Sequence, residues 1–202
     1  MIRRLDEQIS ILNQFIPEVG FIDERRITRG LPLAAEGWFI IPRWQLLAST
    51  YEEALELILE RGNFLNYFHG QLQEREVERG GLEKKLEIIS KSQNSDILIL
   101  PAQLGLLYKG YSSDEVRRSL KENEFQLGAF EMSVILLTHK NRLNHYNDLG
   151  ILCGGDMINP DPEEEIDYTS IPSFSFRGRS SQVSLKWSVQ SLPSYGSVTA
   201  FL

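Results

Sequence analysis

Residues 127–137 read LGAFEMSVILL, an apolar run around which the rest of the chain has to fold. Apolar side chains occupy almost every position, so the segment has no polar face to turn toward water and belongs in a core. Periodicity alone leaves two alternatives, a buried helix or a central strand. The length of the run favours the helix.

Two further apolar runs are typical of short buried strands. Residues 37–42 (GWFIIP) are bounded by glycine and proline, and residues 96–100 (DILIL) stop at Pro101. Apolar residues at helical spacing indicate amphipathic helices before and between these strands. The expected helices cover residues 2–16, 50–62, 82–89 and 112–120. Residues 71–80 are strongly charged and are expected to be exposed.

Two of these helices begin at a capping box, in which a hydroxyl and a carboxylate satisfy backbone amides at the helix start. Thr50 pairs with Glu53 in the first box, and Ser112 pairs with Glu115 in the second. Gly62 is the expected end of the first of these helices. Local sequence therefore defines these elements without help from the rest of the chain.

The last part of the chain has a different pattern. Apolar and polar residues alternate from Phe174 to Val189 across a polar turn at 177–181, which predicts a β-hairpin with one buried face. Residues 198–202 indicate a last strand. We expect an α+β fold, with an N-terminal α/β-like part of amphipathic helices and short buried strands, followed by a C-terminal antiparallel β-hairpin or sheet.

An acidic loop at 156–170 separates these parts, but the residues after it are too few to fold alone, so we expect a single domain over 1–202. Residues 156–167 carry six acidic groups and no basic one, and residues 168–202 carry three basic groups and no acidic one. The net charge of −7 disfavours nucleic acid as a partner. Binding through a local basic patch is left as an alternative, and the patch would consist of Arg25, Arg26 and Arg29 or of Lys109, Arg117 and Arg118.

The composition is that of an ordinary globular protein, with 42% hydrophobic and 24% charged residues in a chain of 202. The longest uncharged apolar stretch, residues 132–137, is far shorter than the roughly 20 residues of a membrane-spanning helix, so we expect no membrane partner. The single cysteine forms no internal disulfide, which agrees with a reducing compartment. We therefore expect a soluble, cytoplasmic protein.

Four phrases occur in the order GWFIIPRW (37–44), DILILPAQLGLLYKG (96–110), NEFQLGAFEMSVILLTH (123–139) and DLGILCGGD (148–156). In this combination the chain resembles a group of small uncharacterised bacterial proteins of about its length, which share GWFxIPRW, PAQxGL, NEFxLGAF and LLTH segments. The resemblance covers roughly residues 1–156 and, more weakly, the C-terminal strands. It implies a bacterial protein but no activity, fold or ligand, so it contributes no functional residue.

Groups able to titrate, bind metal or act as a nucleophile gather in residues 138–156, THKNRLNHYNDLGILCGGD. The candidate catalytic residues are His139, His145, Asp148, Cys153 and Asp156. Either histidine is a candidate base and either aspartate an orienting group, while the cysteine is a nucleophile if an imidazole lies close to its thiol. No catalytic-cysteine signature surrounds Cys153, and its plainer interpretation is a small core residue.

The spacing of the two histidines limits what they do together. His139 and His145 are six residues apart, which places them about 120° apart around a helix or about 20 Å apart along a strand. Neither element lets both bind one metal, and the gap differs from that of common zinc pairs. Only a turn at 141–147 brings them together. We assign no metal ligand, and any cofactor is unknown.

Gln103, Lys109 and Arg117 are candidates for ligand binding. Gln103 follows the apolar strand at 96–100, and ligands in open α/β sheets gather at the carboxyl ends of strands. Lys109 and Arg117 would bind an anion beside it. The plainer interpretation is an exposed loop with basic neighbours.

Trp38, Arg43 and Trp44 are a second candidate group. A guanidinium between aromatic rings stacks on a ligand or holds an anion, and the same combination is usual in protein-interface anchors. The plainer interpretation places Trp38 in the core and Arg43 at a solvated strand end.

Three functional hypotheses follow. The first is a non-enzymatic binding or accessory protein that recognises a protein partner or forms a homo-oligomer, because the polar clusters are scattered and match no catalytic signature. The alternative is a small hydrolase or transferase with its site in residues 138–156, which requires at least three of the candidate side chains to face one pocket. The second alternative is a nucleic-acid-binding module that uses the arginine clusters.

Overall fold

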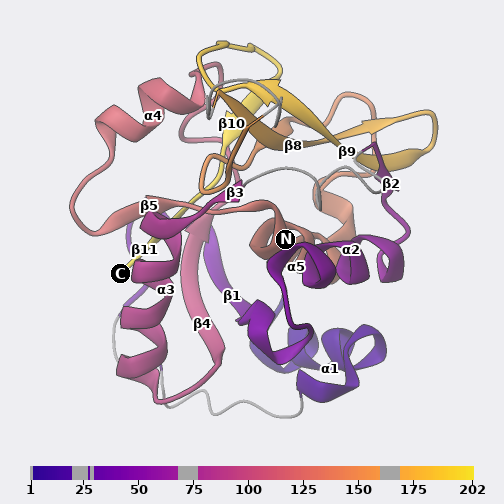
Figure 1. The fold of residues 1–202 in the computed structure, drawn as a ribbon, viewed down its shortest axis with the longest axis vertical. Coiled ribbons are helices and arrows are strands. Elements are labelled where there is room, and N and C mark those ends of the chain that lie inside the picture. The colour runs from indigo at the N-terminus through magenta and orange to yellow at the C-terminus, as the bar shows by residue number, and fades with distance from the viewer. Residues whose placement is uncertain (1, 20–26, 28–29, 68–76, 160–168) are drawn as a thin grey trace.

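The structure is a computed structural model that describes residues 2–19, 27, 30–67, 77–159 and 169–202. Its helices are α1 (Leu5–Phe15), α2 (Tyr51–Arg61), α3 (Gly80–Gln93), α4 (Ser113–Ser119) and α5 (Ala129–Thr138), with short 3₁₀ turns η1 (Pro17–Val19), η3 (Trp44–Leu46) and η4 (Lys140–Arg142). In Figure 1, α2 and α5 lie at mid-height, α1 lies below them and α3 lies to one side.

The strands form two sheets. One has the order β1 (Gly37–Pro42), β4 (Ile97–Gln103), β11 (Thr199–Phe201) and β5 (Glu124–Gln126). The other has the order β10 (Tyr195–Ser197), β6 (Gly150–Leu152), β8 (Ser170–Arg177), β7 (Met157–Ile158) and β3 (Val77–Glu78), while β9 (Ser180–Trp187) pairs with β8 and with β2 (Leu65–Asn66). Figure 1 shows β8 and β9 above α1, α2, α3 and α5. Helices with two largely antiparallel sheets confirm the expected α+β class.

The apolar run at 127–137 is a helix. Every residue of α5 is buried, Glu131 included. The helix contacts α1, α2 and β1. Neighbours on several sides explain why the sequence leaves α5 without a polar face.

The first sheet is antiparallel throughout, and β4 is longer than expected. It continues through Pro101 to Gln103, so the prediction that the strand stops at Pro101 is wrong. Pro101 lies opposite Trp38, whose carbonyl points to the outer edge of β1 and accepts a hydrogen bond from Gln8 Nε2. The pair therefore exchanges no ladder hydrogen bond, and the missing N–H of Pro101 does not weaken the β1–β4 ladder.

Two glutamine side chains close open sheet edges. Gln8 Nε2 donates to the Trp38 carbonyl at 2.8 Å, and Gln8 Oε1 accepts from the Ile40 N–H at 3.1 Å. Gln93 binds both backbone groups of Ile99, at 2.6 and 2.9 Å. Because an amide offers a donor and an acceptor, it replaces a neighbouring strand locally. At these positions β1 and β4 are protected from pairing with another chain.

The last strand belongs to the first sheet rather than to the C-terminal one. β11 lies between β4 and β5, with Thr199 opposite both Gln103 and Gln126. One cluster of buried apolar residues includes Leu100 of the first sheet and Phe174 of the second. The early and late parts of the chain are therefore interlocked.

The C-terminal hairpin forms where the alternating pattern predicts it, with β8 and β9 paired along their whole lengths. Gly178 and Arg179 make the turn, and their φ angles of 58° and 82° match the twist of a two-residue hairpin loop. Phe174 and Val183 are buried in the main core. Ser173, next to Phe174 in β8, belongs to the opposite face of the sheet.

Most of the acidic loop at 156–170 lies outside the described residues, as do Arg25, Arg26 and Arg29 of one expected basic patch. Among the helices that are described, none is both long enough and apolar enough to cross a membrane.

Candidate functional site

His139 follows α5 and is only 5% exposed. Its Nε2 accepts a hydrogen bond from the backbone N–H of Arg3 at 3.0 Å, so the proton of the neutral ring is on Nδ1, 2.8 Å from the Thr138 hydroxyl. Burial lowers the pKa of His139 to about 4. Both ring nitrogens are engaged, and the ring fastens the N-terminal segment to the end of α5.

Asp148 and His145 shape the turn that follows. Asp148 Oδ2 accepts hydrogen bonds from the backbone N–H groups of Asn144 and His145, at 2.8 and 2.7 Å. His145 Nδ1 accepts from the Asn147 N–H at 3.2 Å, and its ring lies 4.3 Å from that of Tyr146. The polar groups of this turn therefore satisfy their own local backbone.

Cys153 and Asp156 lie inside the protein, on the segment that follows β6. The Cys153 thiol is fully buried, and burial raises its pKa, with the carboxylates of Asp156 and Glu131 acting in the same direction. A buried thiol of raised pKa is a poor nucleophile. Asp156 is fully buried and ion-paired with Arg79, so it is not part of a solvated acidic loop.

The candidate catalytic residues do not converge. His139 and Asp148 line one cleft of about 560 Å³. Cys153 and Asp156 are buried, and His145 is exposed. Two of the five candidates share the cleft, whereas the enzyme hypothesis requires at least three of them to face one pocket. Within the described part of the chain, no group of three or more His, Cys, Asp or Glu side chains is placed to hold a metal ion.

Instead, the structure contains a buried charge cluster formed by Tyr51, Arg79, Glu131 and Asp156. Tyr51 begins α2, Arg79 precedes α3, Glu131 lies in the first turn of α5, and Asp156 follows the glycine pair after β6. The exposed fraction of each is 7% or less. We interpret the cluster as a structural element, because its members bind one another and the start of α5.

Arg79 contacts all the other members of the cluster. Its Nη2 donates to Glu131 Oε1 at 2.7 Å, and its Nε lies 3.2 Å from Asp156 Oδ1. The guanidinium carbon is 3.8 Å from the centre of the Tyr51 ring. Tyr51 Oη donates to Asp156 Oδ2 at 2.5 Å. One cation therefore faces two carboxylates and an aromatic ring at once.

Burial and mutual repulsion change the acidity of these groups. Burial raises the pKa of Glu131, opposed by Arg79 and reinforced by Asp156. Burial also raises the pKa of Tyr51, again reinforced by Asp156. Burial alone would lower the pKa of Arg79, but Glu131 and its other anionic neighbours raise it, so the guanidinium stays charged.

The two carboxylates of the cluster cap α5. The N-cap residue, Gly128, has no side chain to do so. Asp156 Oδ2 accepts from the Ala129 N–H at 2.6 Å, and Glu131 Oε2 accepts from the Gly128 N–H at 3.2 Å. A Cβ atom on Gly128 would overlap the Asp156 carboxylate, which explains the glycine. Both negative charges also lie at the positive end of the helix dipole.

Glu83 of α3 connects the cluster to Trp44 and Arg43. Glu83 Oε1 lies 3.5 Å from Arg79 Nη2 and accepts from Trp44 Nε1 at 2.8 Å. Glu83 Oε2 accepts from Arg43 Nη2 at 3.5 Å. Trp38 instead lines a groove beside α3. Trp38, Arg43 and Trp44 therefore do not form one anchor, since two of them support the cluster.

Gln103 is buried and Arg117 is exposed, but both side chains bind other parts of the protein. Gln103 is buried in β4, where its Nε2 donates to the Ser197 carbonyl at 2.8 Å. Arg117 Nη2 donates to the Gly154 carbonyl at 3.2 Å, so it holds the segment that carries Asp156. Lys109 is exposed on the loop after β4. The sheet is antiparallel, so Gln103 does not lie at an edge where the carboxyl ends of parallel strands meet.

The sequence singled out Asp156 but not Arg79 or Glu131, the other two charged members of the cluster. The charge of segment 71–80 predicts exposure, but Arg79 is buried. Glu131 carried a usable signal, because it is the single charged residue of the apolar run at 127–137. A carboxylate in such a run needs a buried cation or several donors. The run therefore pointed to a partner without identifying it.

Comparison with protein-family models, with curated proteins and with solved structures gave no match. The resemblance to a bacterial group stays an expectation based on its four sequence segments. Those segments contain β1, β4, α5 and the buried Asp156.

A loop, residues 104–111, borders the cleft. Gly105 and Gly110 have φ angles of 105° and 85°, which favour glycine. The Gly110 N–H donates to the backbone of β10 at 2.8 Å. Between these fixed points Leu106 lines the cleft and is 65% exposed, and Leu107 is 49% exposed.

The cleft walls carry charges of both signs, on Arg3, Glu7, Glu36, Arg142 and Asp148. Arg142 donates to the carbonyls of Leu149 and Leu104, at 2.8 and 2.6 Å. Glu36 Oε1 accepts from the Leu104 N–H at 2.7 Å. Several polar side chains of the cleft therefore already form hydrogen bonds with the backbone of the cleft walls.

Proposed function

We propose that this chain is a non-enzymatic, cytoplasmic binding protein that recognises another protein through the loop 104–111 and the adjoining cleft. The observation that carries the proposal is the exposure of Leu106 and Leu107 on a loop whose backbone is fixed at both ends. An apolar pair held in water gains free energy when a partner covers it. Tyr111, exposed at the end of the loop, adds a side chain that is enriched in interfaces.

The engagement of the polar side chains supports binding over catalysis. His139 uses both ring nitrogens, and Asp148 uses a carboxylate oxygen on its own turn. The cleft of about 560 Å³ accommodates an inserted partner side chain, as the anchor pockets of interfaces do. The free, buried thiol of Cys153 agrees with a reducing compartment.

The test is the double substitution Leu106→Asp with Leu107→Asp. The matched control is Leu31→Asp with Leu33→Asp, which changes two exposed leucines outside the cleft. Purified proteins are examined by light scattering, and tagged proteins are used for capture from native lysate. We expect wild type and control to bind one protein in stoichiometric amount, and the loop variant to bind it at least about tenfold more weakly, as hot-spot substitutions do.

A solitary monomer that captures no protein would remove the support for this proposal. A partner held equally by the L106D/L107D variant would place the interface elsewhere. A dimer that dissociates in the loop variant would identify the partner as a second copy of this chain. Circular dichroism checks that each variant keeps the wild-type helix content.

A further inference from the structure

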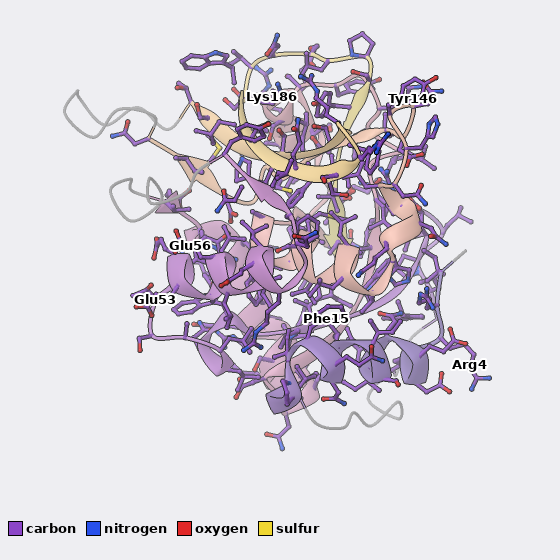
Figure 2. All side chains as sticks on the ribbon, turned by 90° about the vertical axis from the view of Figure 1, so that its right-hand side faces the viewer. Arg4, Phe15, Glu53, Glu56, Tyr146 and Lys186 are labelled. Carbon is purple, nitrogen blue, oxygen red and sulfur yellow. The ribbon has the colours of Figure 1, made fainter. Side chains whose placement is uncertain are left out.

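The second sheet has a face turned away from α2 and α5, and part of that face is open. Figure 2 shows Lys186 on this outer side, with α1, α2 and α5 on the other side of the sheet. Gln182, Ser184 and Lys186 alternate along β9 with residues such as Val183, which is buried in the core. A groove of about 440 Å³ lies here, lined among others by Leu65, Tyr67, Arg177, Gln182, Lys186 and Tyr195.

Arg177 and Lys186 determine the charge of this groove. Of the described residues that line it, none is acidic. Residues 169–202 contain no acidic residue in their sequence. Lys186 Nζ lies 5.7 Å from the centre of the Tyr195 ring. The register of β8 and β9 places Arg177 and Lys186 six residues apart along the hairpin, so the groove has a cation toward each end and no carboxylate from these residues, although the whole chain is acidic.

Two tyrosines bound the groove from opposite sides of β8 and β9. Tyr195 belongs to β10, and its ring packs so closely on Gly150 that a Cβ atom there would overlap it. Tyr67 follows β2, with its N–H 3.3 Å from the Val183 carbonyl, and it is 63% exposed. Tyr195 is packed in place at one side of the groove. Tyr67 has an exposed ring on which a planar group can stack.

Polar groups line the floor between the tyrosines. Gln182 Nε2 donates to the Ser175 hydroxyl at 3.0 Å, which fixes the orientation of the amide. The Ser184 side chain also lines the groove. Amide and hydroxyl groups beside an exposed aromatic ring and two cations are the combination that recognises an unpaired base and its phosphate on a sheet surface.

We propose that this groove binds a nucleotide, free or within a single-stranded nucleic acid, with its base on Tyr67 and its phosphates toward the cations Arg177 and Lys186. The volume of the groove lies within the range of small-ligand sites, roughly 300–1,000 Å³. The site is separate from the loop 104–111, so it goes beyond the protein-binding role and does not depend on it.

The probes are a fluorescein-labelled oligothymidine of ten nucleotides and free AMP and UMP as competitors. The test variants are Arg177→Glu with Lys186→Glu, and Tyr67→Ala. Arg179→Glu is the control for reversal of a charge on this hairpin, since Arg179 is in the turn but lines a different pocket. Tyr146→Ala is the control for loss of an exposed tyrosine.

We expect the R177E/K186E variant to bind the oligonucleotide at least about tenfold more weakly, because carboxylates then face the phosphate in place of two cations. Tyr67→Ala should weaken binding at least about fivefold, in line with one base–aromatic stack. The two control variants should change affinity less than about twofold. The logarithm of the wild-type binding constant should fall against the logarithm of salt concentration with a slope of about −1.4, as two phosphate contacts on a single strand give.

If AMP or UMP displaces the oligonucleotide, a free nucleotide is a sufficient ligand for the groove. If the oligonucleotide binds and neither nucleotide displaces it, the ligand is a single strand. Absence of binding by every probe overturns the proposal. Binding that R177E/K186E and Y67A leave unchanged overturns it as well. Thermal unfolding of each variant shows whether the fold is kept.

Discussion

Replacing Arg79 by methionine tests the role of the buried charge cluster. Methionine keeps an unbranched apolar stem and removes the cation. In the wild type the guanidinium faces Glu131 Oε1 at 2.7 Å and Asp156 Oδ1 at 3.2 Å. Without it, two carboxylates stay buried with no cation between them. The remaining donors, mainly the backbone amides at the start of α5, neutralise only part of this charge.

Removing one partner of a buried ion pair costs about 3–5 kcal/mol. A single domain typically has a free energy of unfolding of about 5–15 kcal/mol, so Arg79→Met should remove a large part of it at pH 8. The loss should shrink toward pH 5, because a protonated carboxyl carries no charge. Burial already raises the pKa of Glu131, so this group stabilises the fold at low pH and loses that contribution as pH rises through its folded-state pKa. Loss of Arg79 raises that pKa further.

Urea unfolding followed by tryptophan fluorescence at pH 5, 6, 7 and 8 measures the difference. Arg4→Met is the matched control, because Arg4 pairs with Asp6 at the surface and its loss should cost no more than about 1 kcal/mol at any pH. Adding Glu131→Gln to R79M should restore part of the stability at pH 8. An R79M loss that is the same at pH 8 and pH 5 would refute the electrostatic explanation and assign the cost to packing.

Three further outcomes are expected. Folding lowers the pKa of His139 to about 4 from an unfolded value of about 6.5. The neutral ring therefore stabilises the fold above pH 6.5, by at most about 3 kcal/mol. This contribution is lost as pH falls through 4. His139→Gln should therefore flatten the pH dependence of the melting temperature over that range, and parallel wild-type and variant curves would contradict this. Gly128→Ala should lower the free energy of unfolding by about 1–3 kcal/mol, because the added Cβ overlaps Asp156. Gly81→Ala, which has open space around it in α3, should raise it by up to about 1 kcal/mol. Equal melting temperatures of the two variants would count against the capping role of Asp156. The Cys153 thiol should react with Ellman's reagent only after unfolding in urea, and rapid labelling of the folded protein would disprove its burial.

Local interactions made the helices and the hairpin predictable. Both capping boxes form as expected, at Thr50 with Glu53 and at Ser112 with Glu115. Each box joins residues within one helical turn, so no distant part of the chain is needed. The same holds for the hairpin turn at 177–181, which needs only two residues with positive φ.

Long-range pairing was not predictable in the same way. Whether Pro101 ends a strand depends on which edge of β4 faces β1, and that is determined by tertiary contacts. Exposure of the charged segment 71–80 is the natural expectation, but Arg79 is buried because distant carboxylates surround it. No local rule assigns Glu131 and Asp156 to the same cation.

The candidate site at 138–156 failed to converge for a related reason. Proximity in sequence gathered groups with catalytic chemistry, but each of them satisfies its nearest backbone or core neighbours. Asp148 closes its own turn, and His139 holds the Arg3 backbone. In the loop 104–111 the sequence draws attention to polar residues, whereas the exposed leucines become evident only from three-dimensional burial.

The position of β11 between β4 and β5 determines when the first sheet is able to form. Thr199 contacts Gln103 across 96 positions and Glu124 across 75. Such distant pairings close only after a large loss of chain entropy, so sheets of this kind form slowly. While the ribosome is still making the segment before residue 199, β4 and β5 lack the strand that joins them and present unpaired edges. In that interval we expect the nascent chain to be open to aggregation and to chaperones.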